Sequence, residues 1–308
     1  MLVLEKLKNI RRWRLKKVSD YVDFEEAFEY FTDKVDEFID VANEKIDDFF
    51  DHMYKKIPGS IFGFTGAAIP TITTITALFL YMTVDPSFSF VTHWISNLGG
   101  GPNGSSFVFN TGMMITSIFI LLFQIYVIRD LKKRSGNQIL VKLLFISAIC
   151  STMGLFFVGV FPLTFAILHG TAASFYFFGG LCFCTLYGIL VLLTPGVHKI
   201  QAILGFITAG FFGLHLFTSM MTAMFTEVEM GINMFTEWLS LFAVLILILE
   251  SAFYSVKAKI SIRRKARENQ IDGPRLSQKN ITKLRNFIES IKKQKIQKQS
   301  FLKRFTRS

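Results

Sequence analysis

Six long apolar segments constrain this chain more than any other feature. They cover residues 59–83, 107–128, 143–161, 170–194, 203–225 and 238–256. An α-helix needs roughly 20 apolar residues to cross about 30 Å of hydrocarbon, and each segment is close to that length. At 51% hydrophobic residues and a mean hydropathy of +0.42, the chain is also more apolar than an ordinary soluble domain. We therefore predict an all-α, multi-pass membrane protein built on a bundle of six transmembrane helices.

The basic residues indicate how these helices are oriented. Between the first and last segments they occur at two connections only, and they are Arg129, Lys132, Lys133, Arg134, Lys142 and Lys199. The alternate connections, 84–106, 162–169 and 226–237, contain no Lys or Arg. Lys and Arg near the ends of membrane spans stay on the cytoplasmic side. We therefore expect both termini in the cytoplasm and these three connections outside.

Charge divides the chain into three parts: a segment 1–56, a membrane domain 57–256 and a tail 257–308. Residues 1–17 hold seven basic residues, and residues 257–308 hold seventeen basic against three acidic. Such basic ends either reflect the orientation rule itself or bind anionic lipid head groups, at about 1 kcal/mol per basic residue. A nucleic acid partner is not expected, because no base-reading motif accompanies the charge.

Residues 20–56 are predicted to form an amphipathic helix. Their apolar residues recur at helical spacing and are Phe24, Phe28, Phe31, Val35, Phe38, Ala42, Phe49 and Met53. Asp20 is a suitable N-cap, and Pro58 ends the run. Thirteen acidic residues in 18–56 disfavour an anionic membrane surface, so we expect this stripe to pack on protein. The partner is either a second copy of the chain or the basic tail, whose shorter stripe comprises Ile281, Leu284, Ile288 and Ile291.

The stretch HWISNLGGGPNGSSFVFNTG, residues 93–112, is the most unusual connection in the chain. Glycines 99–101 permit positive φ, and Pro102-Asn103-Gly104 has turn chemistry. We expect loop 93–106 to fold over an outer pocket, with His169 holding it in place. The candidate ligand-binding residues are His93, Ser96, Asn97, Gly99, Asn103, Asn110, His169 and His215, with Asp85 and Glu237 at the margin. Exposed amides of this loop would suit an anionic head group; alternatively, the loop only forms a re-entrant turn that satisfies helix ends.

Evidence for catalysis or metal binding is slight. Ser96, His169 and Asp85 can be drawn as nucleophile, base and orienting acid, although Ser96 lacks the sequence context of a nucleophile elbow. The histidines lack metal-ligand spacing, and Cys150, Cys182 and Cys184 all fall inside apolar segments as small packing residues. We expect no metal and no cofactor.

Two motifs are similar to those of a known membrane family. Ile95-Ser96-x-Leu98-Gly99 followed by Phe109-Asn110-x-Gly112 resembles the pattern of the family called domain of unknown function 998. A second match is VGVFP, 158–162, followed by His169, Ala173 and Phe177. Both are also similar, more distantly, to the FRAG/DRAM/Sfk-type family. The resemblance covers roughly 57–256 and implies a six-helix membrane protein of unknown activity. The more distant similarity to the FRAG/DRAM/Sfk-type family implies a function that involves lipids. Asn97 stands where that family often has an acidic residue.

The sequence thus predicts an integral membrane protein that binds or accommodates a lipid in an outer polar pocket. A lipid-modifying hydrolase or transferase using His169 is the second hypothesis, and a small-solute transporter is the third. Membrane lipids are the expected partners, together with a protein partner or second copy through 20–56.

Overall fold

The computed structural model describes residues 45–225 and 230–271, together with 282–283, 285–286 and 289. Six helices in this part of the chain are long and apolar enough to cross a membrane. They are α2 (Gly59–Met82), α3 (Ser105–Arg134), α4 (Gln138–Val160), α5 (Ala166–Leu193), α6 (Ile200–Met224) and α7 (Met230–Ile271), with the short 3-10 helix η1 (Ile95–Gly100) between α2 and α3. The prediction of an all-α, multi-pass membrane protein with six spanning helices is confirmed.

Some helices are longer than the apolar segments that predicted them, because polar turns extend their ends. Apolarity predicted that the second span ends at 128, whereas α3 continues to Arg134. Its last turn holds Lys132, Lys133 and Arg134, and cations near a helix C-terminus are stabilised by the partial negative charge there. This basic turn lies outside any apolar slab, because 30 residues at 1.5 Å each make α3 about 45 Å long.

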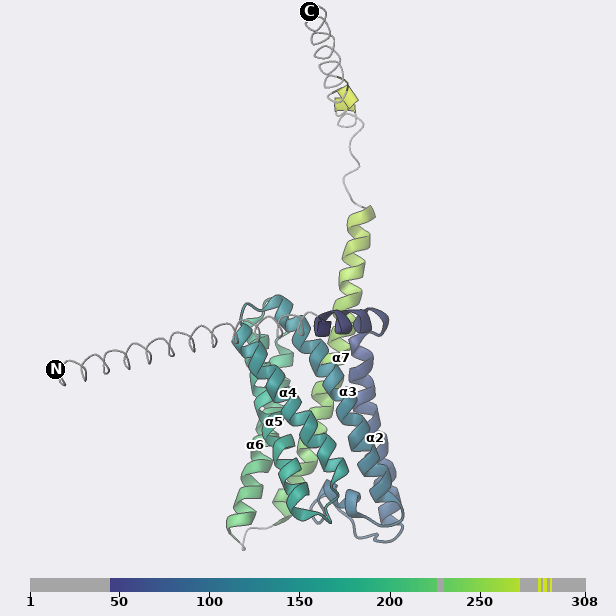
Figure 1. The fold of residues 1–308 in the computed structure, drawn as a ribbon, viewed down its shortest axis with the longest axis vertical. Helices are drawn as coiled ribbons and strands as arrows, with labels where there is room; N and C mark the ends of the chain where they lie inside the picture. Colours follow the sequence, from purple (N-terminus) through teal and green to yellow (C-terminus); the bar gives the residue numbers. More distant parts are fainter. Residues whose placement is uncertain (1–44, 226–229, 272–281, 284, 287–288, 290–308) are drawn as a thin grey trace, which may run out of the picture. The chain divides into compact units, whose positions relative to one another are not determined.

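Helices that follow one another in the chain pack side by side, as Figure 1 shows for α2 to α6. The contact of α4 with α5 is close because each contributes a glycine: a Cβ on Gly154 would lie 2.7 Å from Tyr176 Cα, and one on Gly179 would lie 2.6 Å from the Ser151 nitrogen. Small residues allow helices to approach closely in lipid. There, van der Waals packing and hydrogen bonds stabilise helix association, because the hydrophobic effect does not.

Helix α7 closes the bundle against both α6 and α2. Thr208 Oγ1 donates to the Ala243 carbonyl over 3.3 Å, and Ser240 Oγ donates to the Phe211 carbonyl over 3.2 Å. On the other side, a Cβ on Gly63 would lie 2.9 Å from the Ala252 Cβ. These contacts bring the last span beside the first and enclose an interior between the helices.

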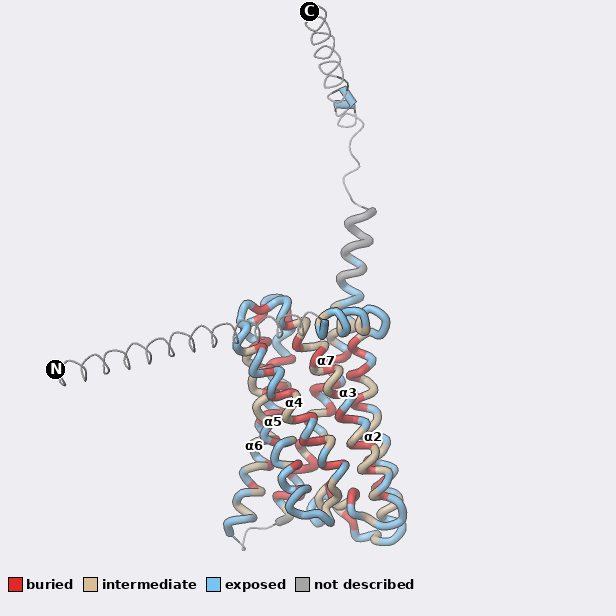
Figure 2. Tube along the Cα trace, in the orientation of Figure 1, coloured by how far each residue is buried: buried red, intermediate tan, exposed pale blue. Residues whose placement is uncertain are grey.

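The burial pattern is that of a protein in lipid. Buried residues lie on the helix faces that meet one another, while the outer faces are exposed (Figure 2). Those outer faces are apolar: Phe79 is 69% exposed, Phe107 76% and Ile167 85%. Contiguous apolar surface of this kind is rare on soluble monomers. In a membrane it contacts the hydrocarbon of the lipids and is not exposed to water.

The chain divides into two compact units at Ala252, with α7 running from the first into the second. Two expectations lie outside the described residues: the helix over 20–44 and the apolar stripe of the basic tail. The end of the predicted N-terminal helix is described, and residues 45–56 are helical, with Pro58 directly before α2.

Candidate functional site

The connection between α2 and α3 forms a tight turn after η1, at the end of the bundle opposite to helix 45–56 (Figure 1). Its positive φ angles are at Asn103, 51°, and Gly104, 81°. Asn103 Nδ2 also donates a hydrogen bond to Thr83 Oγ1 over 2.8 Å. None of glycines 99–101 adopts the positive φ that glycine permits.

Gly99 is required for space instead, because α3 approaches it closely. Its carbonyl accepts hydrogen bonds from Ser106 Oγ at 2.6 Å and from Asn110 Nδ2 at 2.9 Å. A Cβ on Gly99 would lie 2.5 Å from Asn110 Oδ1 and 3.2 Å from Phe109 Cδ1. The first turns of α3 therefore hold η1 by its backbone, and any larger residue at position 99 would require the Asn110 side chain to move.

Helix α7 provides the second anchor of the loop. Glu237 Oε2 accepts a hydrogen bond from the Ile95 backbone N–H over 2.9 Å, and Trp238 Nε1 donates to the His93 carbonyl over 3.0 Å. The amide and hydroxyl of Ser96 also lie near the Glu237 carboxylate. The residue before η1, Trp94, makes no side-chain cap, so this carboxylate satisfies the Ile95 N–H that the helix start leaves unpaired.

His169 does not hold loop 93–106 as we expected. Its Nδ1 is 2.7 Å from the carbonyl oxygen of Phe161, which lies in the connection between α4 and α5. Since a carbonyl can only accept, Nδ1 is the donor, and in the neutral ring Nε2 is then an acceptor. The side chain is buried, with 6% of the residue exposed.

A cavity lies beneath η1, and we call it the η1 cavity. Its polar lining residues are Ser96, Thr116, His169 and Glu237. The rest of its wall is almost entirely apolar and comes from η1, α2, α3, α4, α5 and α7: Ile95, Pro70, Phe109, Met113, Ile120, Leu155, Val158, Ala173, Tyr176, Phe177, Leu241, Val244 and Leu245. Thr116 is 1% exposed, and its hydroxyl has no hydrogen-bond partner among the described residues.

The structure brings together some of the predicted site residues and separates others. Ser96 and His169 line the η1 cavity, and Glu237 joins them from α7. Gly99 and Asn110 build its roof by their mutual hydrogen bond. The remaining candidates are not among its lining residues; they are His93, Asn97, Asn103, His215 and Asp85.

Asp85 and His93 pair with each other outside the cavity. His93 Nε2 is 3.5 Å from Asp85 Oδ2, and the His93 ring stacks on Phe88 with centroids 4.5 Å apart. Hydrogen bonds from the hydroxyl and the amide of Ser87 lower the pKa of the Asp85 carboxyl below its ordinary value. The acid that shares a cavity with Ser96 and His169 is therefore Glu237. The sequence hypothesis had assigned Asp85 as the acid of this group.

His215 belongs to a neighbouring polar network between α6 and α7. Its Nδ1 lies 3.2 Å from Thr236 Oγ1, and Thr236 Oγ1 lies 3.1 Å from Thr218 Oγ1. Phe177, which lines the η1 cavity, stands against the His215 ring with centroids 4.1 Å apart. His215 thus supports the cavity wall from behind.

Within residues 45–225 and 230–271 no group of three or more His, Cys, Asp or Glu side chains is arranged to hold a metal ion. The cavity described above offers one imidazole and one carboxylate.

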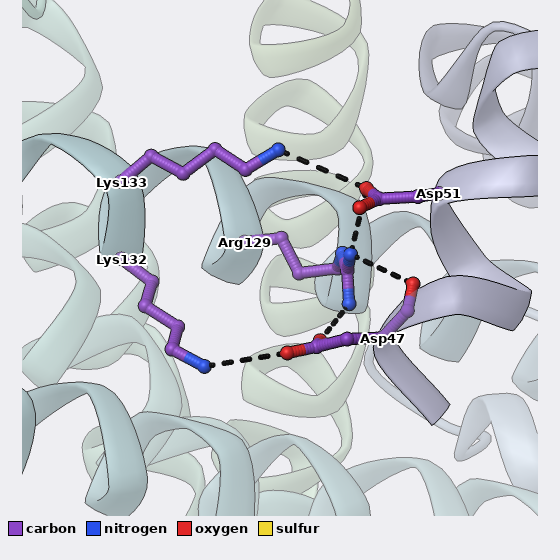
Figure 3. A network of polar contacts seen from close by, with 5 residues as sticks. All are labelled: Asp47, Asp51, Arg129, Lys132 and Lys133. Carbon is purple, nitrogen blue, oxygen red and sulfur yellow. Dashed lines mark hydrogen bonds and ion pairs between the residues drawn. The ribbon is translucent and has the colours of Figure 1, made fainter. Parts of the chain in front are cut away.

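A second polar cluster lies at the opposite end of the bundle, where helix 45–56 meets the last turns of α3 (Figure 3). Arg129 donates to the carboxylates of both Asp47 and Asp51, and also to the Asp47 carbonyl over 3.1 Å. Lys132 Nζ is 3.7 Å from Asp47, and Lys133 Nζ is 3.8 Å from Asp51. The Arg129 hydrogen bond lowers the pKa of Asp51. We call these five residues the Arg129 clasp.

Aromatic packing supports the clasp. Tyr54 donates a hydrogen bond to the Leu122 carbonyl over 2.6 Å, and its ring contacts those of Phe50 and Tyr126. Phe49, which the sequence pattern placed on the packing stripe, is 63% exposed. The described end of this helix therefore packs on α3 of its own chain, a partner that the stripe of apolar residues did not indicate.

A family model described as a protein of unknown function, DUF998, matches residues 67–258, more than half of the chain. No curated protein matches the chain. No solved structure matches it either.

Proposed function

Because the chain belongs to the DUF998 family of proteins of unknown function, we propose its function from the geometry: it binds a membrane lipid in the η1 cavity. The observation that carries this proposal is the cavity's division into a long apolar wall and a small polar end. Ligand sites generally combine mostly apolar walls with a few placed polar groups. An apolar cavity inside a membrane bundle also has hydrocarbon chains as its nearest and most abundant ligands.

The polar end favours an uncharged head group that carries hydroxyls. Glu237 and the Nε2 of a neutral His169 accept hydrogen bonds, and the Thr116 hydroxyl lacks a partner among the described residues. A head group with two hydroxyls can donate one O–H to Glu237 and the other to His169 Nε2, and a further ligand oxygen can accept from Thr116. The described residues that line the η1 cavity include no Lys or Arg that could pair with a phosphate, which argues against the anionic head group that the loop amides first indicated.

We also propose that the η1 end of the bundle faces outward. At the other end, the last turns of α3, the first turn of α4 and the α5–α6 connection hold the basic residues Arg129, Lys132, Lys133, Arg134, Lys142 and Lys199, and this bias supports a cytoplasmic location for that end and for both termini. The η1 cavity then lies in the outer half of the membrane.

Lipid modification is a second candidate function, because Ser96, His169 and Glu237 line one cavity. A hydroxyl nucleophile, an imidazole base and a carboxylate are the groups that acyl transfer uses. Binding and catalysis differ in what is recovered with the protein: an intact lipid class in the first case, a cleaved or transferred product in the second.

Native mass spectrometry of the purified protein with its retained lipids tests the proposal. The variant is Ala173→Phe, which places a ring in the η1 cavity. Its matched control is Ala166→Phe, an exposed position on the same helix. We expect the wild type and the control to retain one lipid class that the variant loses. If all three retain the same lipids in the same amounts, the η1 cavity is not the binding site.

A further inference from the structure

A second cavity continues from the η1 cavity toward the Arg129 end of the bundle. Four residues line both cavities, one each from α3, α4, α5 and α7: Ile120, Leu155, Tyr176 and Val244. We call these four residues the neck. Because they border both spaces, the two cavities lie end to end within the first compact unit of the chain.

Polar groups around the second cavity are largely occupied by the protein. Thr152 Oγ1 donates to the Ala148 carbonyl over 2.7 Å, and Ser151 Oγ donates to the Tyr176 carbonyl over 3.3 Å. Tyr187 and Ser251 both hydrogen-bond to Gln201 Oε1, at 2.8 and 2.6 Å. Gln124 is an exception, with a buried Oε1 that has no partner among the described residues. The space offers a hydrocarbon chain an apolar wall with few competing groups.

The combined length of the two cavities exceeds one leaflet. On α3 the lining runs from Phe109 in the η1 cavity to Val127 in the second cavity, which is about 27 Å at 1.5 Å per residue. Half of a bilayer's hydrocarbon core is only about 15 Å thick. A short chain fills the η1 cavity alone, whereas a long chain has room beyond the neck. One side chain from each of four helices surrounds the neck, an arrangement suited to one chain rather than two.

We propose that the two cavities form one channel for a single-chain lipid with a hydroxyl-bearing head, such as a monoacylglycerol. The head lies at Ser96, His169 and Glu237, and the chain passes between Leu155 and Val244 into the second cavity. This inference rests on the proposed function, which requires the η1 cavity only.

The test compares two probes, monooctanoylglycerol and monooleoylglycerol, by their apparent Kd for the purified protein in native mass spectrometry. The first channel variant is Thr152→Trp, whose side chain lines the second cavity but not the η1 cavity, and its control is Leu143→Trp, an exposed leucine on the same helix. Val127→Phe, at the far end of the second cavity, serves as a second variant in case position 152 does not tolerate tryptophan. We expect the wild type and the control to bind both probes. Both channel variants should bind the octanoyl probe as the wild type does and the oleoyl probe at least tenfold more weakly.

The outcomes separate the two proposals. If the channel variants bind the oleoyl probe as tightly as the wild type, the chain does not enter the second cavity, and the channel is overturned while lipid binding in the η1 cavity stands. If both channel variants lose both probes equally, the second cavity has no separate role and the channel is again overturned. If the wild type binds neither probe and Ala173→Phe changes no retained lipid, the proposed function fails as well.

Discussion

The Glu237 carboxylate accepts a 2.9 Å hydrogen bond from the backbone N–H of Ile95, 142 residues earlier in the chain. This contact joins the last spanning helix to the first residue of η1. It closes the roof of the η1 cavity and places the carboxylate in its wall at the same time. One side chain thus couples the loop conformation to the polarity of the site.

Replacing Glu237 should loosen η1. Glu237→Ala leaves the buried Ile95 N–H without its acceptor, which costs about 1–3 kcal/mol. We expect faster amide hydrogen exchange over 95–100, with exchange in α4 unchanged. Glu237→Gln keeps an amide oxygen as acceptor and should restore most of the protection. Equal exchange in the wild type and Glu237→Ala would show that the roof does not depend on this contact.

Gly99→Ala should destabilise the roof through a clash with α3. The added Cβ would lie 2.5 Å from Asn110 Oδ1, and overpacking of this kind costs typically 1–3 kcal/mol. If the clash is the cause, Gly99→Ala should cost clearly less in an Asn110→Ala background than in the wild type. Thermal unfolding of the four proteins of this double-mutant cycle measures the coupling. Strict additivity would exclude the clash.

His169→Ala should affect the connection between α4 and α5 rather than η1. The His169 ring bonds to the Phe161 carbonyl over 2.7 Å, while η1 is held by Ser106, Asn110 and Glu237. Hydrogen exchange should therefore rise near 161–166 and stay at the wild-type level over 95–100. The reverse pattern would restore the role in holding loop 93–106 that the sequence indicated.

The Arg129 clasp should weaken in acid. The pKa of Asp51 is lowered in the folded protein by the Arg129 hydrogen bond, so its contribution is fully present above its ordinary pKa of about 4. It is lost as the pH falls through the lower folded value. The effect is small, since Asp51 is largely exposed and exposed pairs contribute about 0–1 kcal/mol. Limited proteolysis near residue 57 should accelerate in acid for the wild type and less so for Asp51→Asn.

Single cysteines test the proposed orientation. Val84→Cys and Gly136→Cys are exposed positions at opposite ends of the bundle, and they are placed in a background without the three native cysteines. In intact cells a membrane-impermeant thiol reagent should label Val84→Cys alone. Labelling of Gly136→Cys alone would invert the bundle and place the η1 cavity on the cytoplasmic side.

The sequence by itself determined the fold class and the six spans, because helix length and apolarity are local properties that the membrane thickness selects. It also located the connection around η1 and the residues Ser96, Asn110 and His169, since glycine, proline and isolated polar residues stand out against apolar segments. It even named Glu237 as marginal to a pocket. Each of these signals can be recognised within a short window of residues.

Tertiary structure decided which of these residues meet. Asp85 and Glu237 are both acids near the same end of the bundle, yet only Glu237 reaches the cavity, because α7 packs beside α2 and directs that position inward. Asp47 and Arg129 are 82 residues apart, and nothing in their local sequence pairs them. Such contacts depend on how helices rotate and pack against one another. That packing is set by the fit of many side chains and glycines at once, which no short window of sequence contains.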